Sequence, residues 1–287
     1  MKRIFSLLFV LLLSVSPALS SAPAPSSEGA AAQAVLDISA EEFLSGSAQG
    51  EDAALTPWAP EGLTKTILGS DDRYYGDAAS YPNSAVAQLY LHYPCCDKWL
   101  NPSGFMAGPD LLVTAAHCMV CMDHGGAADR VEAWFGFKNT KNFLYHFTGS
   151  TRYWYGTTFR QPDGSYQYTW QDQDRDYAYL ILSERVGDVT GWFGLTSLSD
   201  TEIEGSVYTV SAYKDWTFQS SRGVAHPYNE YIFSHQADTL PGFSGGPVYD
   251  QNYYVVGINV SASTNENYAH RITGGMLSEM RQNGAIH

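Results

Sequence analysis

Residues 241–248 read Pro-Gly-Phe-Ser-Gly-Gly-Pro-Val. Glycines on both sides of Ser244 allow the backbone to turn so that the amides of Gly242 and Ser244 point at one oxygen atom. The serine hydroxyl projects from the same loop. A plain glycine-rich turn between strands would need neither feature, whereas acyl transfer requires both. We therefore predict that Ser244 is a nucleophile and that the amides of Gly242 and Ser244 form an oxyanion hole.

The same residues also satisfy the Gly-x-Ser-x-Gly elbow of α/β-hydrolases. That fold places a strand before the elbow, a helix after it, and the acid and histidine partners later in the chain. Here the preceding residues 235–241, His-Gln-Ala-Asp-Thr-Leu-Pro, are mostly polar. His270 and His287 follow the serine, but little chain remains to build such a sheet. Chain order therefore argues against the α/β-hydrolase interpretation.

A candidate base lies upstream of the serine. Residues 111–118 read Leu-Leu-Val-Thr-Ala-Ala-His-Cys, an apolar strand that runs into small residues and then into His117. A histidine at a strand end is by itself more often structural. The two alanines before it, however, would let another loop pack beside the imidazole, as a nucleophile must.

A candidate acid lies between these two segments. Residues 176–182 read Asp-Tyr-Ala-Tyr-Leu-Ile-Leu, which places Asp176 directly before an apolar strand. A carboxylate buried at the mouth of a strand can fix the tautomer of an imidazole. Asp172 and Asp174 are rival carboxylates, and we expect them in a solvated turn.

Short apolar or alternating runs separated by Gly, Pro, Asn and Asp predict strands and turns after residue 66. Helical spacing occurs only at 275–281. The sequence therefore predicts an all-β barrel or sandwich with a short C-terminal helix. The expected strands are 86–92, 104–107, 111–115, 131–135, 177–182, 206–212, 246–249 and 253–260.

The first 65 residues differ from the rest. Residues 1–20 place Lys2 and Arg3 before an apolar run and then small residues, which is typical of a secretory signal peptide. The run is shorter than the roughly 20 apolar residues that cross a bilayer. Residues 21–65, rich in Ala, Ser, Pro and acids, resemble a pro-segment. We expect a secreted protein with one domain at 66–287.

The formal net charge is −14. An acidic body repels nucleic acid and anionic lipid, so we expect neither nucleic acid nor a membrane as a partner. We expect a monomer without a cofactor.

Four cysteines occur, Cys95, Cys96, Cys118 and Cys121. Export to an oxidising compartment favours disulfides, with three possible pairings. A zinc site is the alternative, because Cys118 and Cys121 are spaced as a ligand pair and His124 is nearby. Against zinc, Cys95 and Cys96 are adjacent instead of spaced. We therefore expect disulfides and no metal.

Together, TAAHC, DYAYLIL and GFSGGPV, in the order His, Asp, Ser, resemble the signature of chymotrypsin-like serine proteases. The resemblance implies two six-stranded β-barrels, a catalytic triad of His117, Asp176 and Ser244, and protein or peptide substrates. It implies no cofactor.

A narrower resemblance is to bacterial glutamyl endopeptidases. It rests on residues 66–73, Tyr81-Pro82, 104–109, Asp238-Thr239 and 271–273. By this likeness, an activating protease cuts after Lys65 and Thr66 becomes the mature amino terminus. The half-cystine expected before residue 103 falls at Pro102, so Cys95 or Cys96 takes its place and the other is left for Cys121. The pairing stays open. Phe243 replaces the aspartate that chymotrypsin carries before its serine, which excludes an ion pair to a new amino terminus there.

The resemblance also marks a substrate pocket. Thr239 matches the pocket hydroxyl of glutamyl endopeptidases, and a freed amine at Thr66 would supply positive charge. The histidine that helps bind the substrate carboxylate is replaced by Asn259, which weakens the case for glutamate. Asp238 occupies the place of trypsin's pocket acid, so a preference for Lys or Arg is an alternative. We interpret Asp238 mainly as structural.

The sequence therefore predicts a secreted serine endopeptidase made as a zymogen. The rival from another class is a catalytically silent binding module on a protease scaffold, because a fold alone does not guarantee activity.

Overall fold

The computed structural model describes residues 32–36 and 66–286. The predicted signal peptide, most of the predicted pro-segment and His287 lie outside the described residues. The strands are β1 (Ala32–Leu36), β2 (Val86–Tyr93), β3 (Lys98–Leu100), β4 (Ser103–Met106), β5 (Leu111–Thr114), β6 (Arg130–Phe135), β7 (Tyr145–Phe147), β8 (Thr151–Tyr155), β9 (Ala178–Leu182), β10 (Gly194–Leu195), β11 (Val207–Lys214), β12 (Thr217–Pro227), β13 (Ile232–His235), β14 (Pro247–Tyr249), β15 (Tyr254–Ala262) and β16 (Asn267–Arg271).

Helices are few and short in the part of the chain that the structure describes. They are the 3-10 helices η1 (Asn83–Ala85) and η2 (Trp170–Arg175) and the α-helices α2 (Ala116–Met119), α3 (Gly187–Thr190), α4 (Asp200–Ile203) and α5 (Gly274–Gln282). None of the described helices is long and apolar enough to cross a membrane.

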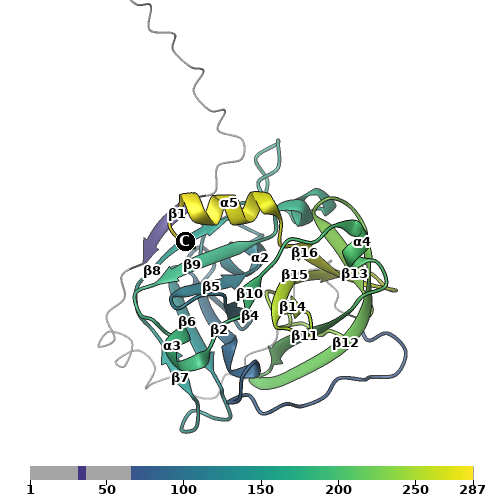
Figure 1. The fold of residues 1–287 in the computed structure, drawn as a ribbon. Coiled ribbons are helices and arrows are strands. Elements are labelled where there is room, and N and C mark those ends of the chain that lie inside the picture. Colours follow the sequence, from purple (N-terminus) through teal and green to yellow (C-terminus); the bar gives the residue numbers. More distant parts are fainter. Residues whose placement is uncertain (1–31, 37–65, 287) are drawn as a thin grey trace, which may run out of the picture. The chain divides into compact units, whose positions relative to one another are not determined.

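The first of two sheets has nine strands in the order β1-β8-β9-β5-β4-β2-β6-β7, with β3 paired to β2 (Figure 1). Strands β5 and β9 are antiparallel, and Thr114 at the end of β5 lies opposite Ala178 at the start of β9. This register brings two chain segments together, the one that follows β5 and the one that precedes β9. His117 belongs to the former and Asp176 to the latter.

The second sheet has seven strands in the order β10-β15-β14-β11-β12-β13-β16, and an additional pairing of β15 with β16 closes it on itself. Closure removes the exposed edges that an open sheet would present. Strand β14 begins three residues after Ser244, and its Pro247 pairs with Ile258 of β15. The serine loop is thereby fixed to the barrel wall.

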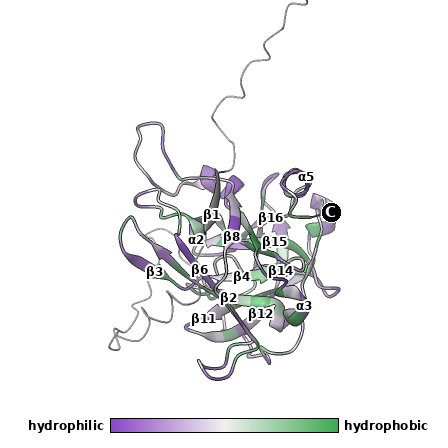
Figure 2. Ribbon diagram, turned by 90° about the vertical axis from the view of Figure 1, so that its left-hand side faces the viewer, coloured by the Kyte–Doolittle hydropathy of each residue, from purple (hydrophilic) through white to green (hydrophobic). Residues whose placement is uncertain are grey.

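Apolar residues fill the interior of both sheets. All four residues of β4 and of β5 are buried, as are eight of the nine residues of β15. Figure 2 shows the hydrophobic ribbon in central strands such as β4, β14 and β15, whereas long outer loops are hydrophilic. The prediction of an all-β fold with two barrel-like sheets and a short C-terminal helix is confirmed.

The eight predicted strands are all present, with ends shifted by one or two residues. The longest strand that the sequence analysis missed is β12, which carries Gln219, Ser220 and Ser221 on its buried part. Their polar groups are bonded to partners far along the chain: Arg73 donates to Gln219, and Ser221 donates to Asp72. A hydropathy pattern gives no sign of such partners.

Candidate active site

The local backbone around His117 explains its position. Strand β5 ends at Thr114, Ala115 is still extended, and His117 lies in the single turn of α2 that follows. Ala115 and Ala116 are fully buried, and His117 is 5% exposed. Small side chains before the histidine leave room for a neighbouring loop, as the sequence pattern predicts.

Asp176 holds His117 by two hydrogen bonds. Its Oδ1 accepts the backbone N–H of His117 at 2.9 Å, and its Oδ2 lies 2.7 Å from the imidazole Nδ1. The hydroxyl of Tyr168 donates to the same Oδ2 at 2.9 Å. Because an ionised carboxylate only accepts hydrogen bonds, Nδ1 carries the proton and Nε2 of the neutral ring is an acceptor. That Nε2 is buried and has no hydrogen-bond partner among the described residues.

The rival acids Asp172 and Asp174 bond residues other than His117. Asp172 caps η2, where its Oδ2 accepts from the backbone N–H and the hydroxyl of Thr169. Asp174 accepts from the side-chain amide of Asn229, and its backbone carbonyl bonds His270. Of the three acids, Asp176 is the one that contacts His117. His270 is buried near these acids, and burial lowers its pKa.

Electrostatics within the pair favour the charged imidazole. Burial lowers the pKa of His117, but the charge and hydrogen bond of Asp176, together with the neighbouring Cys118, outweigh it, so the net pKa lies above its ordinary value. Burial likewise raises the pKa of Asp176, and the charge and hydrogen bonds of His117 outweigh it, so the net pKa is lowered. The pair therefore stabilises an imidazolium of the kind that forms when a histidine takes a proton from a nucleophile.

The loop of Ser244 packs against the segment that leads to His117. A Cβ atom on Gly245 would lie 2.1 Å from Oγ1 of Thr114 and 2.2 Å from the Ser103 carbonyl oxygen, so only glycine allows this approach. Gly245 also has φ of +78°, in the left-handed region. The residue next to Ser244 thus touches Thr114 and the backbone of Ala115, close before His117 in sequence.

Ser103 fastens this loop from the other sheet. Its N–H donates to the Ser244 carbonyl at 2.9 Å, and its hydroxyl donates to the Gly242 carbonyl at 2.9 Å. The same hydroxyl accepts the N–H of Tyr213 on β11. Ser103 is fully buried. We infer that it fixes the orientation of the Gly242–Phe243 and Ser244–Gly245 peptide groups.

The amides of the loop divide into two sets. Those of Phe243, Gly245 and Gly246 donate to the carbonyls of other residues. Those of Gly242 and Ser244 donate to no other described residue. Gly242 has φ of +104°, a conformation that residues other than glycine rarely adopt. Two unpaired amides beside a serine hydroxyl are the donors that an oxyanion requires.

The predicted pocket residues Thr66 and Thr239 meet through Asn267. Oδ1 of Asn267 accepts the backbone N–H of Thr66 at 3.1 Å and the hydroxyl of Thr239 at 2.7 Å. Its side-chain amide donates to the Thr66 carbonyl at 3.0 Å. Asn267 was absent from the sequence prediction because no motif distinguishes it from neighbouring asparagines such as Asn265.

Asp238 and Asn259 do not present free polar groups to a pocket. The carboxylate of Asp238 accepts the backbone N–H groups of Leu68 and Asp72, at 2.6 and 3.0 Å, and is almost fully buried. Asn259 is fully buried. Its Nδ2 donates to the Phe243 carbonyl, and its Oδ1 bonds Nε2 of His235. Asn259 thus stabilises the loop of Ser244 through the hydrogen bond to the Phe243 carbonyl.

The four cysteines are free in this structure, so the predicted disulfides are not seen. Cys118, the residue after His117, is buried. The sulfurs of the other three gather with His124 in one cluster. Disulfides, with the pairing left open, were expected from export to an oxidising compartment, which says nothing about where each sulfur points.

One family model and two relatives match this chain at the sequence level. A family model described as a trypsin-like peptidase domain matches residues 102–258. An extracellular metalloprotease of Bacillus subtilis is 25% identical over 225 residues, which cover 75% of this chain and 69% of that protein. A glutamyl endopeptidase of Bacillus licheniformis is 27% identical over 196 residues, which cover 66% of this chain and 56% of that protein. The chain thus spans little more than half of the second relative.

Solved structures share the fold at lower identity. A Glu endopeptidase in complex with MPD has a TM-score of 0.62 at 14% identity. The superposed region covers 77% of this chain and 100% of the chain of that endopeptidase. The protease Anisep from Arthrobacter nicotinovorans has a TM-score of 0.55 at 13% identity, covering 75% of this chain and 100% of its own. A scabies mite inactivated protease paralogue has a TM-score of 0.53 at 17% identity, covering 74% of this chain and 98% of its own.

Proposed function

Since the chain belongs to the trypsin-like peptidase domain family and is a serine endopeptidase, we propose that Ser244, His117 and Asp176 are its catalytic triad. The observation that carries the proposal is the pair of bonds from Asp176 to His117, which leave a buried Nε2 without a partner. The loop of Ser244 packs against the strand end that leads to this imidazole.

The reaction follows from these roles. The hydroxyl of Ser244 attacks the carbonyl carbon of the peptide bond while Nε2 of His117 takes its proton. The amides of Gly242 and Ser244 donate to the oxygen that gains negative charge. His117 then gives the proton to the amine nitrogen as the C–N bond breaks, so the amine leaves and the acyl group stays bonded to Oγ of Ser244. Water, deprotonated by His117, then attacks this ester, which frees the acid and returns the proton to Ser244. Asp176 keeps the ring in the productive tautomer and stabilises the imidazolium.

Replacing the nucleophile tests this assignment. Ser244→Ala should abolish peptide cleavage and labelling by a fluorophosphonate while leaving the circular dichroism spectrum unchanged. Undiminished cleavage by the variant would overturn the triad. Correctly processed wild-type protein that takes no label would instead favour a silent binding module. The fold leaves that outcome open, because one solved neighbour is described as an inactivated protease paralogue.

The enzyme is a secreted zymogen that an activating protease cuts after Lys65. The change of composition at residue 65 and the docking of Thr66 on Asn267 support this proposal. One relative is described as extracellular. Amino-terminal sequencing of active, secreted protein should find Thr66, and Lys65→Gln should delay activation. Full activity with a start near residue 21 would contradict the zymogen proposal.

The substrate side chain before the cut is acidic. Cleavage after Lys65 would turn the N–H of Thr66 into an ammonium group, 3.1 Å from the amide oxygen that also binds Thr239. A cation near this wall favours a carboxylate. Asp238, the acid that would suit Lys or Arg, is already bonded to two backbone amides. Digestion of a mixed peptide pool should give cuts after Glu or Asp, whereas cuts after Lys or Arg would support the alternative.

The name of the Bacillus subtilis relative suggests a metal-dependent hydrolysis as a second candidate. In the described part of the chain, the one group of at least three His, Cys, Asp or Glu residues spaced to hold an ion is Cys95, Cys96, Cys121 and His124. None of the triad residues belongs to it. Stoichiometric labelling of Ser244 should remove all peptide hydrolysis if the triad performs it, and should leave a metal-dependent hydrolysis intact.

A further inference from the structure

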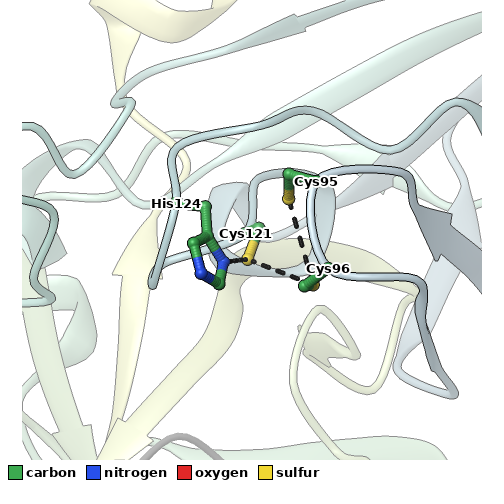
Figure 3. A group of neighbouring side chains, drawn as sticks. All are labelled: Cys95, Cys96, Cys121 and His124. Carbon is green, nitrogen blue, oxygen red and sulfur yellow. Dashed lines mark hydrogen bonds between the residues drawn. The ribbon is translucent and has the colours of Figure 1, made fainter.

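Three cysteines and one histidine converge from two loops of the first sheet. Cys95 and Cys96 lie in the turn between β2 and β3, and Cys121 and His124 follow α2. Their ligand atoms all lie within 4.8 Å of one another. Figure 3 shows these side chains next to one another, with dashed contacts that run from His124 through Cys121 and Cys96 to Cys95.

Three of the six separations between the four ligand atoms match a tetrahedral metal site, and all six are within 4.8 Å. Sγ of Cys96 lies 3.9 Å from Sγ of Cys95 and 3.8 Å from Sγ of Cys121, and the latter lies 3.5 Å from Nδ1 of His124. A zinc ion bound at about 2.3 Å to sulfur and about 2.0–2.1 Å to nitrogen places neighbouring sulfurs about 3.8 Å apart and sulfur and nitrogen about 3.5 Å apart. We propose that Cys95, Cys96, Cys121 and His124 bind one zinc ion.

The loop after α2 is shaped for this convergence. The N–H of Gly125 donates to the Cys121 carbonyl at 2.7 Å, and the N–H of Cys121 donates to the Gly126 carbonyl at 2.8 Å, so the segment folds back on itself. Gly125 has φ of +69°. A Cβ on Gly126 would lie 2.9 Å from both Cβ and Sγ of Cys95, so glycine lets the two loops approach.

A zinc ion would bind all four side chains of this cluster, whereas a disulfide would join only two of them. Any single disulfide among Cys95, Cys96 and Cys121 leaves the third thiol unpaired beside it and gives His124 no role. The separations of 3.8 and 3.9 Å are also far from the roughly 2.05 Å of a bonded pair. On zinc binding, each of the three thiols releases its proton to solvent and the imidazole binds as the neutral ring, with no change of oxidation state.

The donor set indicates a structural ion. Four protein ligands fill a tetrahedral zinc and leave no position for water or substrate, whereas hydrolytic zinc sites keep one open. The ion would join the β2–β3 turn to the chain that leaves α2, and Cys121 follows the last residue of α2, Met119, by two residues. We infer that it holds α2, and hence the imidazole, against the sheet.

Metal content and cobalt spectroscopy test the site on the full chain, purified under reducing conditions. We expect about one zinc per chain, and Co²⁺ substitution should give the intense visible bands of a tetrahedral site with sulfur-to-metal charge transfer. Cys96→Ser and Cys121→Ser should weaken binding more than about 100-fold, since each removes a direct ligand. Cys118→Ser, which changes the cysteine outside the cluster, and His226→Ala, a histidine on β12, should leave stoichiometry and spectrum unchanged.

A second measurement, made on the wild-type protein, tests the zinc site even if the ligand variants fail to fold. Titrating the wild-type zinc protein with a mercurial thiol reagent should release the ion as the cluster thiols are modified. Loss of two hydrogens in the intact mass, mapped to a disulfide within the cluster in freshly secreted protein, would overturn the proposal. Absence of stoichiometric zinc or cobalt binding, or equal loss of binding in Cys118→Ser, would also overturn it. Every readout is independent of peptide cleavage and thus of the proposed triad.

Discussion

Replacing Asp176 by asparagine should disable the base without removing the nucleophile. In the wild type, Oδ1 accepts the fixed backbone N–H of His117, and Oδ2 accepts from Nδ1 and from Tyr168. The asparagine oxygen would face the backbone N–H, which cannot turn into an acceptor. The NH₂ group would then face Nδ1 and the tyrosine hydroxyl, and both can become acceptors.

This arrangement moves the imidazole proton to Nε2, where it blocks transfer from Ser244. A triad histidine in the wrong tautomer loses about 10⁴ in kcat, which corresponds to about 5.4 kcal/mol of transition-state stabilisation. The pH profile should shift as well. Because the neutral ring is the base, kcat/KM of the wild type rises with pH through a His117 pKa that lies above its ordinary value. Without the carboxylate, the burial that lowers this pKa remains, so the rise should move to lower pH.

The assay is peptide hydrolysis over the pH range, with the fluorophosphonate labelling rate measured in parallel. Asp172→Asn and Asp174→Asn are matched controls, since these neighbouring acids do not contact His117. Each should keep kcat within about 10-fold of the wild type. The reasoning is refuted if Asp176→Asn loses less than about 10-fold in kcat, or if either control loses as much as Asp176→Asn.

Three further substitutions probe the support of the site. Gly245→Ala would place Cβ 2.1 Å from Oγ1 of Thr114. We therefore expect either no folded protein or a fluorophosphonate labelling rate at least about 100-fold lower. Labelling at the wild-type rate would contradict this packing. Ser103→Ala leaves the N–H of Tyr213 unpaired and should lower the free energy of unfolding by about 1–3 kcal/mol in urea titrations, and an unchanged midpoint would contradict it. Tyr168→Phe removes one of the hydrogen bonds to Asp176 and should lower kcat by less than about 10-fold. A loss of kcat equal to that of Asp176→Asn would contradict this supporting role of the hydroxyl.

Much of the fold follows from local pattern. Strands such as β5 and β9 are continuous apolar runs, and their hydropathy predicts them directly. The turn at Ser244 is also local, because glycine is required at Gly242 and Gly245 by their positive φ. The choice of Asp176 over Asp172 rests on its place before β9, and the pairing of Thr114 with Ala178 gives that choice a structural reason.

The pocket could not be predicted in the same way, because side-chain direction depends on distant partners. Asn259 was expected in the substrate pocket from the resemblance to glutamyl endopeptidases, whereas its side-chain amide donates to the Phe243 carbonyl. Asn267 bonds Thr66, 201 residues before it in sequence, and Thr239, 28 residues before it. The cysteines show the same limit, because adjacency in sequence argued against a metal, whereas the turn after β2 brings both Cys95 and Cys96 to one point.

Locating the covalent adduct of a fluorophosphonate tests the account most directly. Protein cut after Lys65 is labelled, digested and analysed by mass spectrometry. The account predicts one adduct per chain, on Ser244, formed at a rate that falls together with kcat/KM in Asp176→Asn. An adduct on another residue, or full peptide hydrolysis by protein that takes no label, would contradict the assignment of Ser244 as the nucleophile.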